Sequence, residues 1–156
     1  MSEPYQAFFS SEIGNIRITA SETAIETLYF VEEAAAPSPE MPPVLQECLR
    51  QLEAYFRGEL KDFSLKLQPQ GTAFQQSVWQ QLLEVPYGST ATYLDIARRL
   101  GDRNAVRAVG SANGRNPISL IIPCHRIIGA NGRLIGYGGG LWRKEWLLRH
   151  EGALLV

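Results

Sequence analysis

The chain of 156 residues has little of what holds metals or disulfides: two cysteines, Cys48 and Cys124, and two histidines, His125 and His150. Two cysteines cannot form the disulfide framework of a small secreted protein, so we expect a reducing, cytoplasmic environment. These four side chains also do not follow the ligand spacing of the usual zinc sites. We therefore expect no metal and no cofactor.

Long apolar runs are also absent: no apolar run in the sequence approaches the roughly 18 residues of a membrane span. The start, Met1-Ser2-Glu3-Pro4, lacks the basic and then apolar pattern of a secretory signal. The composition, 45% hydrophobic and 20% charged, is ordinary for a globular protein that can bury a real core. We expect no membrane partner.

The small net charge of −1 hides an uneven division along the chain. Residues 1–71 contain five Lys/Arg and eleven Asp/Glu, whereas residues 72–156 contain ten Lys/Arg and five Asp/Glu. Nine of the ten basic residues in the second part are Arg, the better side chain for binding phosphate. The division hints at nucleic-acid binding by the second part, although scattered surface charge gives the same counts.

The first part of the chain has the pattern of a small α/β domain, which we place at residues 1–68. An apolar stripe at helical spacing predicts a helix over 44–56 and puts Cys48 in the core. Residues 68–71 have the composition of a linker. Alternation and turn chemistry predict four strands, at residues 7–9, 14–20, 25–31 and 63–67.

The second part, residues 72–156, is predicted to be mostly helical. Thr72 with Gln75, and Thr92 with Asp95, have the spacing of capping boxes. They open helices that run to about residues 83 and 100, and a third helix is expected over 104–114. The last two helices, joined by a short turn containing Gly101, have the outline of a helix-turn-helix.

The helix over 104–114 is built from small residues around one arginine. Gly110, Ser111 and Gly114 lie near Arg107 on one face. Because Gly inside a helix costs about 1 kcal/mol relative to Ala, something must approach this backbone closely. DNA contact and tight helix–helix packing both fit this pattern.

Residues 121–128 read Ile-Ile-Pro-Cys-His-Arg-Ile-Ile and set the Cys124 thiol beside the His125 imidazole. A base next to a thiol is the chemistry of an activated nucleophile. A free cysteine in an apolar run is also common in a core strand. The pair alone does not decide between the two.

Four segments together resemble the O6-alkylguanine-DNA alkyltransferases, also called methylated-DNA–protein-cysteine methyltransferases. They are Asn116-Pro117, the segment 121–128, Gly-Tyr-Gly-Gly-Gly at 136–140 and Lys-Glu-Trp-Leu-Leu-Arg-His-Glu-Gly at 144–152. The resemblance runs from about Phe74 to Gly152. It implies an α+β fold, in which a small N-terminal α/β domain precedes a mostly helical, winged-helix-like domain with a helix-turn-helix.

The resemblance implies direct DNA repair with a role for each of five residues. Cys124 takes the alkyl group from O6-alkylguanine, and from O4-alkylthymine, and is irreversibly spent. His125 acts on the thiol through a water molecule, and Glu151 orients His125. Asn116 braces the turn before the active-site loop, and Tyr93 donates a proton to the leaving guanine.

The same resemblance implies how double-stranded DNA and the base are held. Arg107 enters the base stack vacated by a flipped guanine, while Ala108, Gly110 and Ser111 let the helix enter the minor groove. Contacts mainly to phosphates predict binding with little sequence preference and strong salt dependence. A monomer is expected, and cooperative binding along DNA stays open.

The implied base pocket is walled by Tyr137 and Gly138, with the carbonyl groups of Cys124 and Ile127 accepting from the guanine amine. Gly138 stands where some relatives carry Ser, which affects little because a backbone N–H makes the expected contact. The Cys and His cluster with which some members bind zinc in the N-terminal domain is missing here.

Three other functions are compatible with parts of the sequence. A lesion-binding protein that does not transfer the alkyl group would lack the reactive cysteine, which is present. A cysteine hydrolase using Cys124, His125 and Glu151 leaves Arg107 and its small-residue helix without a use. A transcription regulator with a helix-turn-helix leaves the Cys-His-Arg segment unexplained.

Overall fold

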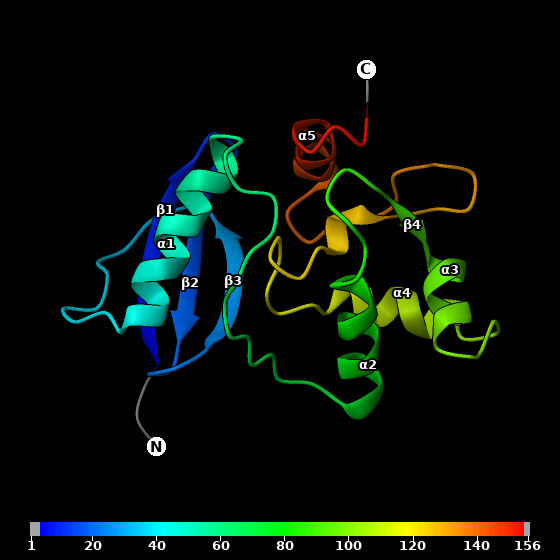
Figure 1. Cartoon of the computed structure of the whole chain (residues 1–156), viewed down its shortest axis with the longest axis horizontal. Coiled ribbons are helices and arrows are strands. Elements are labelled where there is room, and N and C mark those ends of the chain that lie inside the picture. The colour runs from blue at the N-terminus through cyan, green and yellow to red at the C-terminus, as the bar shows by residue number, and fades with distance from the viewer. Residues whose placement is uncertain (1–3, 155–156) are drawn as a thin grey trace. The chain divides into compact units, whose positions relative to one another are not determined.

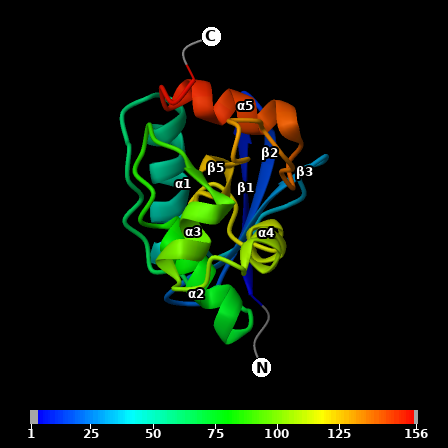
Figure 2. The ribbon, with the colours of Figure 1, turned by 90° about the vertical axis from the view of Figure 1, so that its right-hand side faces the viewer.

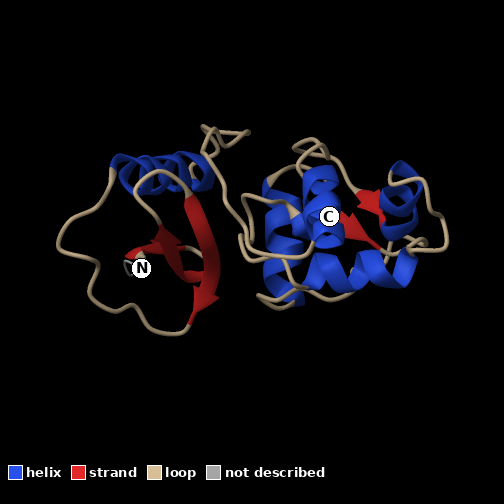
Figure 3. Ribbon diagram, turned by 90° about the horizontal axis from the view of Figure 1, so that it is seen from below, coloured by secondary structure: helices blue, strands red, loops and turns tan. Residues whose placement is uncertain are grey.

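A computed structural model describes residues 4–154, which form two compact units, one up to Gln70 and one from Gly71 onward. The first unit pairs a sheet with one helix, and the second is mostly helical (Figures 1 and 3). The α+β class expected from the sequence is therefore confirmed.

The first unit is a three-stranded antiparallel sheet covered by one helix. Its strands, in the spatial order β1-β2-β3, are β1 (Tyr5–Ser11), β2 (Gly14–Ala20) and β3 (Ile25–Val31). The helix α1 (Pro43–Phe56) packs against them. The second and third strands have their predicted bounds. The first extends beyond the predicted 7–9 on both sides, because Tyr5 to Ser11 pairs residue by residue with β2.

The buried face of α1 follows the predicted stripe. Pro43 opens the helix at a position where a missing N–H costs nothing. Leu45, Cys48 and Leu52 have no exposed surface, so the core position predicted for Cys48 is confirmed. Burial raises the pKa of the Cys48 thiol to about 12. This cysteine is therefore protonated and chemically inert at neutral pH.

The predicted strand at 63–67 is wrong. The segment makes one parallel bridge, between Leu67 and Ile25, and no ladder. Backbone bonds to β3 are confined to Ile25, whose N–H donates to the Lys66 carbonyl over 2.9 Å and whose carbonyl accepts from the Gln68 N–H over 2.8 Å. At Ser64 the partner is the buried side chain of Gln51 on α1: Ser64 N–H donates to Oε1 over 2.9 Å, and Nε2 donates to the Ser64 carbonyl over 3.3 Å. At Ser64, a side-chain amide thus takes the bonds that a neighbouring strand would have made.

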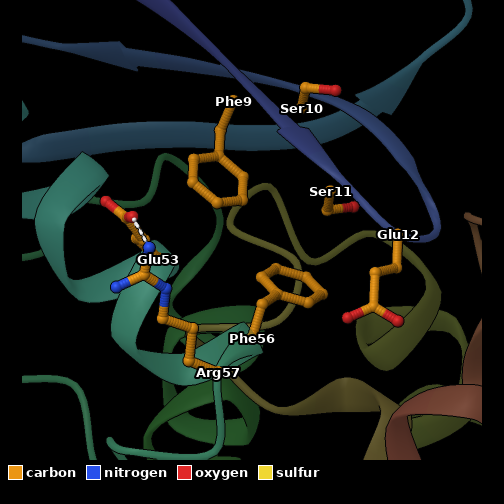
Figure 4. A pocket seen from close by; sticks show the side chains of 7 residues that line it. All are labelled: Phe9, Ser10, Ser11, Glu12, Glu53, Phe56 and Arg57. Atoms are coloured by element: carbon orange, nitrogen blue, oxygen red, sulfur yellow. Dashed lines mark ion pairs between the residues drawn. The ribbon is translucent and has the colours of Figure 1, made fainter.

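A cavity of about 260 Å³ lies between the end of β1 and the end of α1 (Figure 4). The rings of Phe9 and Phe56 stack there with centroids 5.7 Å apart. An ion pair of 2.7 Å joins Arg57 to Glu53 on the rim, and both side chains are more than half exposed. Such a pair contributes little to stability.

The second unit combines helices with two very short strands, which Figure 3 shows among the helices and of which Figure 2 labels β5 (Ile127–Ile128). Both capping boxes predicted from the sequence are formed, by Thr72 with Gln75 and by Thr92 with Asp95. The elements are α2 (Ala73–Leu82), β4 (Ala91–Thr92), α3 (Tyr93–Arg99), α4 (Val106–Gly114), the 3-10 turn η1 (Cys124–Arg126), β5 (Ile127–Ile128) and α5 (Leu141–His150).

Two features of this unit had no counterpart in the sequence analysis. One is the parallel pairing of β4 with β5, in which Ala91 faces Ile127 and Thr92 faces Ile128. Two-residue strands leave no period to detect, yet this pairing ties the start of α3 to the segment after Cys124. The other is α5, which packs against η1. None of the helices in residues 4–154 has the length and apolar character needed to cross a membrane.

Trp79 links α2 to α4 inside the second unit. Trp79 is 2% exposed, and its indole N–H donates to the Ala112 carbonyl over 2.8 Å. Helices α2, α3 and α4 all pack against one another. One hydrogen bond of high sequence separation therefore helps to position α4.

We predict that Trp79→Phe lowers the free energy of unfolding by about 1–3 kcal/mol, because the buried Ala112 carbonyl loses a donor. Urea denaturation measures the loss. Trp142→Phe is the matched control, since Trp142 is 55% exposed and should change stability by no more than about 0.5 kcal/mol. Equal losses in both variants would contradict a special role for the indole N–H.

Candidate active site

The loop before η1 is held by the side chain of Asn116. Its Nδ2 donates to the Ile122 carbonyl over 2.8 Å, and its Oδ1 accepts from the Ile118 N–H over 3.0 Å. The same side chain bonds the Cys124 thiol. Asn116 is 5% exposed, so these bonds form away from water. One amide thus fixes the path of the chain and the position of the sulfur.

Leu120, in the same loop, has φ +73° and is the one non-glycine residue with positive φ in residues 4–154. Left-handed backbone is strained for a residue with a branched side chain. Leu120 is 1% exposed, so surrounding packing holds it in this conformation. Its backbone also bonds the Cys124 thiol and lowers the pKa of that thiol.

Cys124, His125 and Arg126 occupy one 3-10 turn, and all three are buried. Successive side chains in such a turn point about 120° apart. The thiol and the imidazole are therefore directed to different neighbours, and no hydrogen bond joins them within the described residues. Adjacency in sequence has not produced direct contact.

Both residues that follow Cys124 are bonded to Glu151, which comes directly after α5. The carboxylate accepts from His125 Nε2 over 2.8 Å, from Arg126 Nε over 2.8 Å and from Arg126 Nη2 over 3.1 Å. Arg126 Nη1 also donates to the Val85 carbonyl over 2.7 Å. The Glu151 side chain has no exposed surface. A charge-assisted network of this kind is strong because water does not compete for it.

The network determines which groups carry charge at neutral pH. Burial works to raise the pKa of Glu151, but hydrogen bonds and charge from His125 and Arg126 prevail and bring it to about 2. Burial lowers the pKa of His125 below 6.5, against the opposing effect of Glu151. A carboxylate accepts only, so His125 Nε2 carries the proton and Nδ1 is the basic nitrogen. Nδ1 is buried and has no hydrogen-bond partner among the described residues.

The Cys124 thiol experiences opposing influences. Burial raises its pKa, while hydrogen bonds from Asn116 and the backbone and the charge of Lys144 lower it. Burial prevails, so the sulfur is protonated at rest. It becomes a nucleophile only when a base takes its proton.

Tyr93 and Tyr137 both experience the charge of Cys124. Tyr93 is half-buried, and its hydroxyl donates to the Ile135 carbonyl over 3.2 Å. The Tyr137 hydroxyl is buried, and its ring lies edge-on to His125 with centroids 6.5 Å apart. Burial and the nearby thiol raise the pKa of both phenols, that of Tyr137 well above 10. Two protonated phenols therefore lie close to the sulfur.

Lys144 belongs to this site but had no role in the sequence analysis. It has no exposed surface, and its Nζ donates to the carbonyls of Ile127, of Ile135 over 3.1 Å and of Gly136 over 3.3 Å. Burial lowers its pKa to about 8, while Cys124 raises it. Lys144, Leu147 and Leu148 are the buried residues of α5. Helical spacing from the two leucines was the signal that placed this lysine inward.

The remaining predicted residues lie outside the thiol network. On α4, Arg107, Ala108 and Ser111 are exposed, and a Cβ built on Gly110 would lie 3.8 Å from the Tyr93 ring. This glycine therefore faces α3. Gly138 is exposed, and a Cβ built on it meets no atom within 4 Å. Residues 4–154 contain no group of three or more His, Cys, Asp or Glu side chains that could hold a metal ion.

Comparison with known proteins matches two family models to the chain. "6-O-methylguanine DNA methyltransferase, DNA binding domain" matches residues 73–153, and "6-O-methylguanine DNA methyltransferase, ribonuclease-like domain" matches residues 5–69. A methylated-DNA–protein-cysteine methyltransferase of Methanosarcina acetivorans is 50% identical over 96% of this chain and 99% of that protein.

Solved structures match as well. The crystal structure of Mycobacterium tuberculosis O6-methylguanine methyltransferase is 43% identical, with a TM-score of 0.86, over 96% of this chain and 93% of that chain. The structure of Mycobacterium tuberculosis OGT in complex with DNA is 44% identical, with a TM-score of 0.85, over 93% and 91% of the two chains.

The geometry predicts that acid destabilises the protein through Glu151. Its pKa is about 2 when folded and near 4.3 in an unfolded chain. The stabilisation is complete above about pH 5 and is lost as the pH falls through 2; it amounts to about 3 kcal/mol. His125, whose pKa is lowered by folding, adds a loss that begins below about pH 6.5.

Glu151→Gln should therefore lower stability at pH 7 by about 3–5 kcal/mol, because Arg126 stays buried without its partner. It should also flatten the dependence of stability on pH between about 5 and 2. Chemical denaturation at a series of pH values measures both effects. Glu145→Gln, which removes an exposed ion pair with Arg149 on the same helix, is the control. Curves of the same shape for both variants would contradict the prediction.

Proposed function

Because the chain belongs to the 6-O-methylguanine DNA methyltransferase family, we propose that it repairs DNA by moving the alkyl group of O6-alkylguanine onto Cys124. The relatives that span nearly its whole length carry the name of this activity. The observation that carries the proposal is a buried thiol, Cys124, next in sequence to a buried, neutral imidazole, His125, that is bonded to the Glu151 carboxylate. The transfer needs no cofactor.

The reaction begins with removal of the thiol proton. A water molecule takes it from Cys124 to His125 Nδ1, and Glu151 stabilises the resulting imidazolium through Nε2–H. The basic Nδ1, buried and without a protein partner, supports this route. The thiolate then attacks the alkyl carbon: the bond between Sγ and carbon forms, and the bond between carbon and the guanine O6 breaks.

The electron pair of the broken bond goes to the guanine, which needs a proton to leave as a neutral base. Tyr93 donates it, in line with its half-buried, protonated hydroxyl near Cys124. The proton held by His125 later returns to Tyr93 through solvent and restores the phenol. In the net reaction Cys124 loses its thiol hydrogen and gains the alkyl group, while the guanine loses the alkyl group and gains a hydrogen. The thioether is not hydrolysed, and each molecule acts once. Asn116 keeps the sulfur in place by its bonds to the loop.

The target carbon lies inside the duplex, so the guanine must be flipped out at a cost of a few kcal/mol. We place α3 and α4 on the DNA as a helix-turn-helix, with α4 in the minor groove and Arg107 in the vacated stack. Ala108 and Ser111 are small, exposed residues of α4. Their size supports close approach of the DNA to the backbone of α4. The excess of arginine in residues 72–156 supports contact with phosphates.

In this proposal the flipped base enters a pocket walled by Tyr137 and Gly138. Gly138 has open space around it, which allows close approach of a ring. The carbonyls of Cys124 and Ile127 accept from the guanine amine. The Ile127 carbonyl already accepts from Lys144 and has a second lone pair for the base. O4-alkylthymine is a second substrate of the same pocket. The protein acts as a monomer.

Intact-mass spectrometry tests the transfer. After incubation with duplex DNA containing O6-methylguanine, we expect the protein to gain one methyl group, in a stoichiometric amount, on Cys124. Cys124→Ala should abolish the gain. Cys48→Ala is the matched control and should react as the wild type does, because Cys48 is buried with a pKa of about 12. A methyl group on Cys48 would contradict the assignment.

The same experiment separates the other functions. DNA binding without any gain in mass would indicate a lesion-binding protein. Repeated turnover, with more substrate consumed than protein present, would indicate a cysteine hydrolase. Neither outcome is compatible with the proposed single-use transfer.

The role of Arg107 predicts a difference between two substrates. Arg107→Ala should slow repair of O6-methylguanine in duplex DNA by about tenfold or more, since an unstacked base costs a few kcal/mol. Its reaction with free O6-benzylguanine should stay as in the wild type. Single-turnover rates for both substrates measure the effect.

Arg98→Ala, which removes an exposed positive charge from α3, is the control for charge alone. It should weaken duplex repair only slightly. If Arg107→Ala lowered the rate equally on duplex DNA and on free O6-benzylguanine, Arg107 would have no role in the base stack. Equal losses in the two arginine variants on duplex DNA would reduce Arg107 to a phosphate contact.

A further inference from the structure

Lys144 has an environment that the proposed chemistry leaves unexplained. It is a fully buried ammonium group whose hydrogen bonds go to three neutral carbonyls, and within residues 4–154 it forms no salt bridge. Burying a charge without a partner of opposite charge is costly. A methionine of similar length would fill the same space on α5 at lower cost. The charge itself therefore needs a reason.

We propose that Lys144 is a positioning residue for the alkyl transfer: its ammonium group holds the pocket wall together and stabilises the thiolate form of Cys124. The inference rests on the proposed function and assigns a part of it to a residue that touches neither substrate nor sulfur.

The three carbonyls come from two separate segments of the chain. Ile127 lies in β5, directly after the turn that carries Cys124, whereas Ile135 and Gly136 lie in the segment that leads to Tyr137. Gly136 has φ +56°, so the chain turns sharply where the ammonium binds. Lys144 joins these segments to the first turn of α5.

The connection extends to α3 through a shared acceptor. The Ile135 carbonyl accepts from Lys144 Nζ over 3.1 Å and also from the Tyr93 hydroxyl over 3.2 Å. Tyr93 is the proton donor of the proposed reaction, and Tyr137 follows Gly136 in sequence. One ammonium group therefore sets the position of both phenols relative to Cys124.

The charge acts at one stage of the reaction. Cys124 starts as a neutral thiol, passes through a thiolate and ends as a neutral thioether. Lys144 and Cys124 act on each other electrostatically, so the cation favours the thiolate stage above the other two. The free-energy cost of burying the Lys144 charge in the resting protein is thus offset by its attraction to the thiolate when the sulfur ionises.

Other charges around the sulfur do not supply this effect. Arg126 donates from Nε and Nη2 to the two oxygens of the Glu151 carboxylate, so this carboxylate compensates its charge locally. His125 becomes a cation only by taking the thiol proton, and Glu151 then compensates that charge, so Lys144 is the cation that is in place before the sulfur ionises. The ionisable groups that interact with Cys124 are Tyr93 on α3, Tyr137 before α5 and Lys144 on α5. These groups in turn interact with His125, Glu151 and Arg143, and His125 also interacts with Arg126.

The dependence of the reaction rate on pH tests the inference. Free O6-benzylguanine is the substrate, so that DNA binding plays no part, and the benzyl adduct is followed by intact mass. Lys144→Met removes the charge and keeps the length of the side chain. We expect the midpoint of its rate profile to move up by about one pH unit and the rate at pH 7 to fall about tenfold.

Two further variants make the test specific. Arg149→Met removes an exposed cation from the same helix and should leave the profile where it is in the wild type. Lys144→Arg keeps the charge but not the compact ammonium. It should react more slowly with an unmoved midpoint, and it carries the test if Lys144→Met does not fold by circular dichroism and thermal unfolding.

The outcomes are distinct. A folded Lys144→Met protein with the wild-type midpoint, or with a rate lowered equally at every pH, overturns the role of the charge. A Lys144→Arg protein in which the midpoint of the rate profile moves to higher pH also overturns the role of the charge. A wild-type protein that gains no benzyl group and no methyl group overturns the proposed function, and this inference with it.

Discussion

The buried carboxylate of Glu151 is the interaction on which the reactive part of this protein depends. It holds His125 and Arg126, two neighbours in one tight turn, from the end of a helix that lies 25 residues further along the chain. Arg126 then reaches the Val85 carbonyl, which adds the segment before α3 to the same network. Without the carboxylate, the buried Arg126 guanidinium would have no opposite charge beside it, and His125 Nε2–H would lose its acceptor.

This arrangement leaves the Cys124 sulfur protonated at neutral pH. Burial keeps Cys124 protonated, while the Asn116 amide, the Lys144 ammonium and backbone N–H groups favour its ionised form. The balance protects the thiol, because a permanently exposed thiolate would be consumed by oxidation. Cys48 shows the contrast: burial in an apolar core without such partners leaves a thiol inert.

Much of the secondary structure was predictable because it is encoded locally. Thr72 and Thr92 carry their helix starts in four residues each, and the strands at 14–20 and 25–31 alternate over seven. The segment 63–67 alternates equally well, yet Gln51 bonds its backbone and no ladder forms. The two-residue pairing of β4 with β5 has no local pattern, because its stability comes from a partner 36 residues away.

The sequence by itself determined the pairing of the Cys124 thiol with an adjacent imidazole and the family, since these rest on residue types at fixed spacing. Only the tertiary structure decided how they are connected. It directed His125 to Glu151 rather than to Cys124, gave Glu151 a second partner in Arg126, and turned Lys144 inward onto three carbonyls. The physical reason is that the charge state of a buried group depends on burial and on partners from distant segments, and spacing along the chain contains neither.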